Sequence, residues 1–145
     1  MPQVHLFIYG SLLAPPVLRA LLDRQPCAQA AWLPDFRRAA LRGQPFPGIV
    51  PAPGARTPGA LIEVQRRELG MLDAWEDDFF RRRRVRVCLP GGNVLEAQAY
   101  VLNRRHRHLA AARPWSAAVV GRLAPACAQQ ARRWRRDRNP GLRHT

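Results

Sequence analysis

The sequence predicts an α+β protein in which a mixed, mainly antiparallel sheet, curled or closed, is covered by two or three helices. Three observations support this fold class. Apolar runs rich in β-branched residues occur in both halves of the chain, stretches of helical periodicity lie between them, and no glycine-rich phosphate loop is present. A chain of 145 residues can bury a sizeable core, so we expect a single domain over residues 1–145.

The first expected strand covers residues 4–9, where the run VHLFIY ends at Gly10 and predicts a strand followed by a turn. Pro15 and Pro16 come next, and proline is well tolerated in the first turn of a helix. The apolar residues 17, 18, 21 and 22 follow with helical spacing. We therefore expect the first helix directly after this pair of prolines.

The middle of the chain alternates between strand candidates and turn-forming residues. Residues 28–33 and 36–43 predict two strands, with a turn at Pro34 and Asp35 between them. Residues 44–58 contain five prolines and two glycines, which predict an ordered loop or an extended crossing and exclude a helix.

A strand and a helix are expected next along the chain. Residues 59–64 have the composition of a strand. Residues 66–77 predict a helix that places Leu69, Leu72 and Trp75 on one face.

The remaining residues predict a hairpin and a C-terminal helix. The hairpin turns around residues 90–93, and valines alternate with Arg84 and Arg86 on its first arm. This alternation predicts that the two arginines face solvent on a half-buried strand. From about residue 114 the chain is expected to be helical, interrupted at Pro125 and ending in a basic tail.

The chain is strongly basic. Its formal net charge is +14 and all 24 basic residues are arginine, so its surface should attract anionic small molecules and nucleic acids. No helix-turn-helix, zinc or RNA-recognition pattern accompanies the arginines, so no specific nucleic-acid partner is expected. Three widely spaced cysteines predict neither a disulfide framework nor a metal site. The absence of a secretory signal and of a long apolar run favours a cytoplasmic protein without a membrane partner.

The carboxylates are concentrated in one region. Six of the ten acidic residues lie between Glu63 and Asp78, directly before four consecutive arginines at residues 81–84. Glu76 lies inside this region. One interpretation is a solvent-exposed acid at a helix end that pairs with a neighbouring arginine, because such surface pairs are common.

Three separated segments carry a resemblance to a known family. They are IYGSL after the first strand, PFPGIVP in the proline-rich segment and LDAWEDDFFRRRRVRV around the end of the second helix. Together, and in this order, they resemble the γ-glutamylcyclotransferase-like superfamily, including its plant AIG2-like branch. The resemblance runs from about residue 4 to residue 103. It implies a small mixed, mainly antiparallel β-barrel with flanking α-helices.

The same resemblance implies an enzyme that cyclises a γ-glutamyl amide to 5-oxoproline and releases an amine or amino acid, without a cofactor. Glu76 matches the glutamate of the family's LDxxE motif and would be the general acid and base. The family usually has tyrosine at the positions of Phe46 and Phe80, so this chain would keep the hydrophobic walls without those hydroxyl groups. The implied substrate-binding residues are Tyr9, Gly10, Ser11, Leu12, Pro47, Gly48, Phe80 and Tyr100.

These residue types suit the implied chemistry. The α-amino group that must attack the γ-carbonyl is mostly protonated at neutral pH, and one carboxyl can remove its proton and later return a proton to the departing nitrogen. Burial of Glu76 would raise its pKa toward the working range. Successive N–H groups in the turn from Gly10 to Leu12 would bind the α-carboxylate or the developing oxyanion.

Two other functions are consistent with the sequence. A non-catalytic relative would bind a small anionic ligand in the same pocket. A basic nucleic-acid-binding domain would use the RRRRVR strand and the C-terminal stretch RRWRRDRNPGLR. The sequence leaves open whether the protein is a monomer or a homodimer, and which amine is released.

Overall fold

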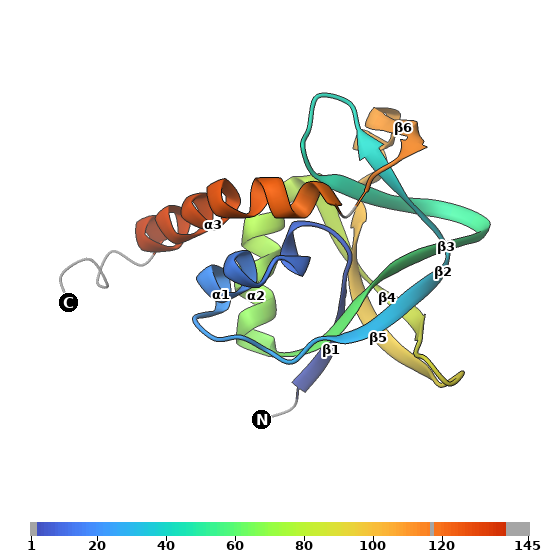
Figure 1. The fold of residues 1–145 in the computed structure, drawn as a ribbon, viewed down its shortest axis with the longest axis horizontal. Helices are drawn as coiled ribbons and strands as arrows, with labels where there is room; N and C mark the ends of the chain where they lie inside the picture. Colours follow the sequence, from blue (N-terminus) through green and yellow to red (C-terminus); the bar gives the residue numbers. More distant parts are fainter. Residues whose placement is uncertain (1–2, 117, 139–145) are drawn as a thin grey trace.

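The fold is a curled six-stranded sheet with the helices α1, α2 and α3 gathered on one side (Figure 1). The computed structural model describes residues 3–116 and 118–138. In chain order the elements are β1 (Gln3–Ile8), η1 (Ser11–Leu13), α1 (Pro15–Leu22), β2 (Gln29–Leu41), β3 (Pro47–Gln65), α2 (Arg66–Glu76), η2 (Asp77–Phe79), β4 (Phe80–Cys88), β5 (Val94–Leu102), η3 (Arg104–Leu109), β6 (Ala110–Pro114) and α3 (Ala118–Arg138). This is the mixed α+β architecture that the sequence predicts.

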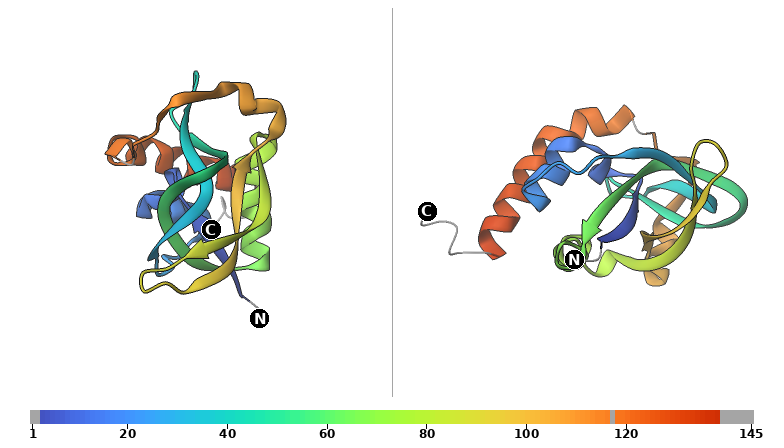
Figure 2. Two further views of the ribbon diagram at one scale, coloured as in Figure 1. Left: turned by 90° about the vertical axis from the view of Figure 1, so that its right-hand side faces the viewer. Right: turned by 90° about the horizontal axis from the view of Figure 1, so that it is seen from below.

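The sheet closes on itself. β1 pairs antiparallel with the end of β3 and parallel with β5, and β5 forms a hairpin with β4. β2 pairs antiparallel with β3 along most of its length and meets β4 at the Trp32–Cys88 pair. The pairings β3–β1–β5–β4–β2–β3 therefore form a ring, and β6 lies beside the end of β2. Figure 2 shows this curled arrangement from two directions.

A single strand, β2, replaces the two strands and the turn that the sequence predicts. The pairing of β2 with β3 shifts register between Pro34 and Phe36, as at a β-bulge, and Asp35 has a left-handed φ of 66°. The Asp35 carboxylate accepts a hydrogen bond of 2.9 Å from the N–H of Gly54 on the paired strand. These turn-forming residues therefore bend one strand instead of separating two.

Residues 47–58 of the proline-rich segment form the first part of β3, and residues 44–46 lead into it. The backbone is extended, as in the predicted extended crossing, and it pairs with β2. Here β3 has a paired neighbour on one side only, since its pairing with β1 involves Ala60 and later residues. Proline is tolerated on such an edge, where its missing N–H removes no hydrogen bond from the ladder.

The helix and hairpin predicted for the second half of the chain are confirmed. α2 ends at Glu76, and β4 pairs with β5 along its whole length. Val85 and Val87 are buried, whereas Arg84 and Arg86 are exposed, so β4 follows the predicted alternation.

The C-terminal third differs from the prediction in two ways. η3 and β6 occupy residues 104–114, and the helix starts only at Ala118. α3 also continues through Pro125, where an interruption was expected. A proline inside a helix removes one backbone hydrogen bond, here the bond to the Gly121 carbonyl, and a helix of 21 residues retains many others. The end of the expected basic tail, residues 139–145, lies outside the described residues.

β1 separates two parts of the hydrophobic core. Alternate side chains of a strand point to opposite faces, so Leu6 and Ile8 pack against the three helices. Phe7 and Tyr9 point the other way and pack with side chains inside the ring. Tyr9 is thus the last inward-facing side chain before the chain leaves the sheet.

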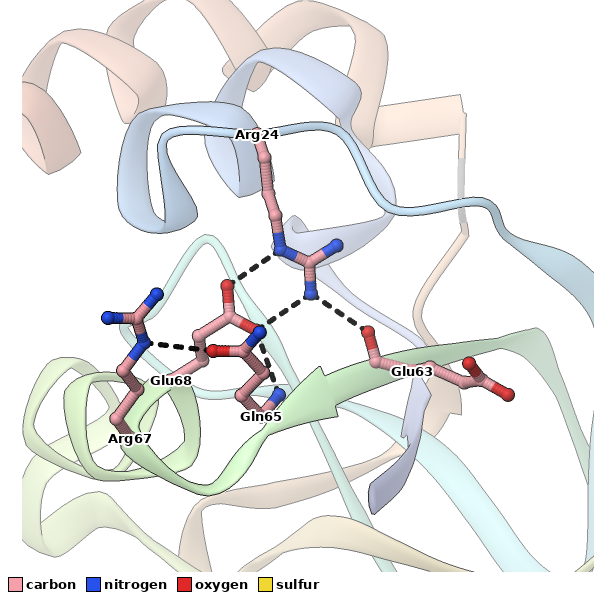
Figure 3. Close-up of polar contacts among 5 residues, drawn as sticks. All are labelled: Arg24, Glu63, Gln65, Arg67 and Glu68. Carbon is pink, nitrogen blue, oxygen red and sulfur yellow. Dashed lines mark hydrogen bonds and ion pairs between the residues drawn. The ribbon is translucent and has the colours of Figure 1, made fainter. Parts of the chain in front are cut away.

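Arg24, just after α1, is tied to the start of α2 (Figure 3). Its guanidinium donates two hydrogen bonds of 2.7 Å to the Glu68 carboxylate and one of 3.0 Å to the Glu63 carbonyl. Glu68 also accepts the Gln65 N–H at 2.8 Å and completes a capping box at the N-terminus of α2. The hydrogen bond from Arg24 lowers the pKa of the Glu68 carboxyl. This network fixes the direction of the helix whose last residue is Glu76.

Arg24→Ala should lower the free energy of unfolding by about 1 to 2 kcal/mol, because the nearly buried Glu68 carboxylate loses its partner while solvent screens part of the loss. Arg67→Ala is the matched control, since Arg67 is exposed and its side chain bonds only Gln65 in the same network. Its effect should stay below about 0.5 kcal/mol. Urea denaturation measures both, and equal losses would show that the Arg24–Glu68 pair does not hold α2.

Candidate active site

A cavity of about 600 Å³ lies where the ends of several elements meet. Its walls come from the end of β1 and the following turn, the segment leading into β3, the C-terminal end of α2, β5 and α3, which lies beside α1 (Figure 1). Most of the lining side chains are apolar or aromatic. This size and composition are typical of sites that bind small molecules.

Glu76, the last residue of α2, lines this cavity. Its carboxyl forms no hydrogen bond or ion pair with any other residue that the structure describes, so the expected surface pair with a neighbouring arginine is absent there. The side chain is half-buried because it faces the cavity, yet protein surrounds it closely. Burial, and then the negative charge of Asp73, raise the pKa of Glu76 to about 8.

Asp73, one turn earlier on α2, connects the helix to the β4–β5 hairpin. Its carboxylate accepts hydrogen bonds from the Tyr100 hydroxyl at 2.7 Å and from Arg82 at 2.9 and 3.1 Å. Burial disfavours ionisation of Asp73, but the bonds from Arg82 and Tyr100 outweigh it and leave the pKa of Asp73 below its ordinary value. The two carboxyls of this helical turn therefore differ. The ionised form of Asp73 is stabilised, whereas the protonated form of Glu76 is stabilised.

The turn after β1 supplies polar groups to the same cavity. The Leu13 N–H donates to the Gly10 carbonyl at 2.9 Å, but the N–H groups of Ser11 and Leu12 have no acceptor among the described residues. Cys127 of α3 lines the same cavity, and burial first, then the charge of Glu76, raise the pKa of its thiol, while the nearby Ser11 hydroxyl lowers it. The turn is thus a candidate donor site in the cavity that Glu76 also lines.

Two tyrosines join strands at the rim of the cavity. The Tyr9 hydroxyl donates to the Tyr100 carbonyl. Burial raises the pKa of Tyr9, and the charge of Glu76 raises it further. Burial likewise raises the pKa of Tyr100, with contributions from its bond to Asp73 and from the charges of Asp73 and Glu76. Both phenols therefore stay protonated and act as hydrogen-bond donors.

The structure brings together most of the residues that the resemblance implies. Gly48 is the exception, because it does not line the cavity and lies against Leu41 and Leu102. Gly10 packs closely on Pro47, since an added Cβ would lie 3.0 Å from the Pro47 Cγ. The predicted residues that line the cavity are Tyr9, Gly10, Ser11, Leu12, Pro47, Glu76, Phe80 and Tyr100.

Phe46 and Phe80, the positions without hydroxyl groups, form one wall of the cavity together with Phe79. The rings of Phe46 and Phe79 meet edge to face at 5.2 Å, and those of Phe46 and Phe80 lie 6.0 Å apart. This wall is entirely hydrocarbon.

Asp77 and Asp78 form the turn that follows Glu76. Asp77 has a φ of 55° and a ψ of −150°, a conformation that side-chain-bearing residues rarely adopt and that stores strain next to Glu76. Asp78 forms an ion pair of 2.5 Å with Arg105, and its carbonyl accepts a hydrogen bond of 3.1 Å from the Asn103 side chain.

α3 forms a wall of the cavity that was not predicted from the sequence. Leu123, Cys127 and Trp134 of this helix line the cavity, and the Trp134 ring packs edge to face on Trp75 at 5.4 Å. Their spacing of four and seven residues follows one helix face, which is the signal that could have identified them. Trp134 was instead grouped with the arginines of the C-terminal stretch.

Other kinds of site receive no support from the described residues. Within residues 3–116 and 118–138, no group of three histidine, cysteine, aspartate or glutamate side chains is arranged to hold a metal ion. No helix in these ranges is long and apolar enough to cross a membrane. β4 carries exposed arginines outside the cavity lining, at residues 81, 83, 84 and 86.

The chain matches the family model described as gamma-glutamyl cyclotransferase, AIG2-like, over residues 6–117, well over half of its length. The chain belongs to this family. Among AIG2-like relatives, protein D of Arabidopsis thaliana is 39% identical over 98 residues, which cover 66% of this chain and 64% of the relative. Protein C of the same organism is 37% identical over 98 residues, covering 66% and 57%. The matches thus span about three fifths of these relatives.

Solved structures support the fold of this AIG2-like chain. The solution structure of an Arabidopsis thaliana protein superimposes with a TM-score of 0.70 at 27% identity, covering 87% of this chain and 85% of the other. An AIG2-like protein of Mus musculus superimposes with a TM-score of 0.62 at 20% identity, covering 80% and 90%. The family match ends before α3, so the helical wall of the cavity lies beyond it.

Glu76→Gln should make the protein less sensitive to alkaline pH. Because the pKa of Glu76 is raised to about 8 in the folded state, folding binds a proton between the ordinary glutamate pKa and pH 8. The free energy of unfolding should therefore fall as pH rises through this window in the wild type, and less so in the variant. By pH 9 the variant should be more stable by on the order of 3 kcal/mol.

Thermal or urea denaturation between pH 5 and pH 9 (roughly the range in which this group titrates) measures the difference. Glu96→Gln is the control, since Glu96 is exposed and meets Arg84 only at 3.6 Å. Its effect should stay within about 0.5 kcal/mol throughout. Parallel pH curves for Glu76→Gln and the wild type would mean that Glu76 is not a buried, proton-binding carboxyl.

Proposed function

We propose that this AIG2-like protein is a γ-glutamylcyclotransferase that converts a γ-glutamyl amide into 5-oxoproline and a free amine, with Glu76 as general acid and base. The observation that carries the proposal is the state of Glu76. Its carboxyl lines the cavity, lacks a partner among the described residues and has a pKa of about 8. Such a carboxyl destabilises the fold at high pH but is well suited to proton transfer.

The α-nitrogen must lose two protons, and the departing nitrogen must gain one. Ionised Glu76 takes the first proton from the substrate's α-ammonium group, and the freed amine attacks the γ-carbonyl to close a five-membered ring. Protonated Glu76 then gives this proton to the departing nitrogen as the amide C–N bond breaks. Ionised again, Glu76 takes the second proton from the ring nitrogen and passes it to the released amine or to solvent, which restores the starting carboxylate. A pKa of about 8 is closer to that of an amine than the ordinary glutamate value, so the first transfer is less uphill.

Backbone donors would hold the negative parts of the substrate. The N–H groups of Ser11 and Leu12, which have no acceptor in the part of the chain that the structure describes, would bind the α-carboxylate or the oxyanion that forms on the γ-carbonyl oxygen. Pro47 and Phe80 would then enclose the acyl chain and keep it folded on itself. Holding the amine against the carbonyl accounts for a large share of the rate, since effective molarities reach on the order of 10⁵ M.

Asp73 would keep the site ready without reacting itself. Its charge is retained by Arg82 and Tyr100, and it lies close enough to Glu76 to raise the pKa of that carboxyl. The proposed reaction requires only protein groups and substrate.

Glu76→Gln should reduce turnover by about 10² or more with substrate binding largely kept, because glutamine preserves shape but accepts no ammonium proton. In the wild type, kcat/KM should rise with pH up to about 8, as Glu76 ionises. The assay is release of 5-oxoproline from a panel of γ-glutamyl amides. Asp78→Asn is the control, because Asp78 is exposed and pairs with Arg105 outside the cavity lining.

Turnover retained in Glu76→Gln would refute the proposed mechanism. A wild-type protein that binds these amides without releasing 5-oxoproline would instead identify a non-catalytic relative with the same pocket.

A further inference from the structure

The position of Glu76 depends on the backbone around it. No hydrogen bond or ion pair holds its carboxyl within residues 3–116 and 118–138, so the side chain has no polar anchor there. The next residue, Asp77, has a φ of 55° and a ψ of −150°, which a residue with a side chain rarely adopts. Such a conformation persists only where surrounding contacts hold it. The contacts that hold Asp77 therefore help to determine where Glu76 faces.

Asn103, directly after β5, binds the far side of this turn. Its N–H donates to the Phe79 carbonyl at 2.9 Å, which continues the β4–β5 pairing one position beyond Phe80 and Leu102. Its side-chain amide donates to the Asp78 carbonyl at 3.1 Å. One residue therefore binds two successive carbonyls of η2.

The other polar groups of Asn103 are bound to η3. Its side-chain oxygen accepts the Arg105 N–H at 3.4 Å and caps this short helix, and its carbonyl accepts the His106 N–H at 2.8 Å. The His106 ring stacks on Phe79, with centroids 4.5 Å apart and planes 7° apart. Since the amide oxygen is bound to η3, the amide nitrogen is directed at η2.

We propose that Asn103 is a positioning residue for Glu76, acting through the turn at Asp77 and Asp78. Its side-chain amide keeps Asp77 in the unfavourable conformation, and the turn then keeps Glu76 directed into the cavity and Phe79 in its wall. Without the amide, Asp77 relaxes towards ordinary backbone angles and water reaches the carboxyl. Asn103 itself does not line the cavity. The catalytic consequence of this inference rests on the proposed function, whereas the placement of Glu76 does not.

Asn103→Ser and Asn103→Ala separate positioning from helix capping. Serine retains an oxygen that caps η3 but lacks the amide nitrogen that bonds Asp78, and alanine lacks both. Both variants should lower kcat for 5-oxoproline release by about tenfold or more, with KM within about threefold of the wild type, since a displaced carboxyl acts on bound substrate. A serine variant with wild-type kcat would show that Asn103 only caps η3 and would overturn the inference.

The ionisation of Glu76 gives a readout that does not require turnover. In both variants a more solvated carboxyl should titrate at least about one pH unit below the wild-type pKa of about 8, as measured by ¹³C NMR of labelled glutamates. The substitutions are uncharged and leave in place the other titratable groups around Glu76, namely Tyr9, Asp73, Tyr100 and Cys127.

This titration separates the inference from the proposed function. A lowered pKa in the variants, with a wild type that releases no 5-oxoproline, would leave the positioning of Glu76 standing and refute the enzymatic proposal. A pKa that stays at the wild-type value in both variants would overturn the inference even if kcat falls.

Arg105→Gln is the matched control on the same turn. The Arg105 guanidinium pairs with the Asp78 carboxylate at 2.5 Å, but both side chains are largely exposed, so the pair contributes little. This variant should keep kcat within about twofold and the pKa of Glu76 within about 0.3 units of the wild type. Equal effects of Arg105→Gln and Asn103→Ala would show that the amide has no specific role.

A double-variant cycle with Asp77→Gly tests whether Asn103 acts through the strained backbone. Glycine adopts the conformation of Asp77 without steric cost, so the turn no longer needs the amide to hold it. The loss of kcat caused by Asn103→Ala should therefore be at least about threefold smaller when residue 77 is glycine. An equal loss in both backgrounds would show that the amide does not act through Asp77 and would overturn the inference.

Discussion

Closure of the sheet through β1 is the constraint on which the rest of the structure depends. β3 pairs with one edge of β1 and β5 with the other, so β1 ends at one fixed place beside Tyr100. The hydrogen bond from Tyr9 to the Tyr100 carbonyl joins the neighbouring strands there. α2 follows β3 directly, and the Arg24–Glu68 network sets its direction, so its last residue returns to the same end. Strand pairing thus assembles a cavity from segments that are distant in the sequence.

Two carboxyls three residues apart on α2 have opposite electrostatic environments. Asp73 is stabilised as an anion by Arg82 and Tyr100, whereas Glu76 faces the cavity without a comparable donor among the described residues. Burial of Glu76, and then the fixed charge on Asp73, favour the protonated form of Glu76. Separating pKa values in this way is how paired carboxyls take different roles in enzyme sites. It also explains the acid-rich stretch before the arginines, since Arg82 anchors one acid and leaves the other free.

The sequence predicted the parts of the fold that depend on local pattern. The alternation of Val85 with arginines, the periodicity of α2 and the turn after β1 each depend on neighbouring residues, and the structure confirms them. The sequence left open whether the proline-rich segment is a loop or an extended crossing, because proline is tolerated in a strand where one edge is unpaired, a property of the whole sheet. The helical spacing of Leu123, Cys127 and Trp134 indicates a shared face of α3, but the position of that face at the cavity depends on how α3 packs. The family motifs predicted Glu76 and the turn residues, which line the cavity, and also Gly48, which packs against Leu41 and Leu102.

The ionisation of Glu76 is the property that connects the fold to the proposed reaction, and it can be measured directly. The chain has four glutamates, so selective ¹³C labelling of their carboxyls yields four NMR titration curves, and the spectrum of Glu76→Gln identifies the relevant one. If Glu76 is the buried proton shuttle, its resonance titrates near pH 8. Titration of all four carboxyls below about pH 5, as in model peptides, would contradict that role.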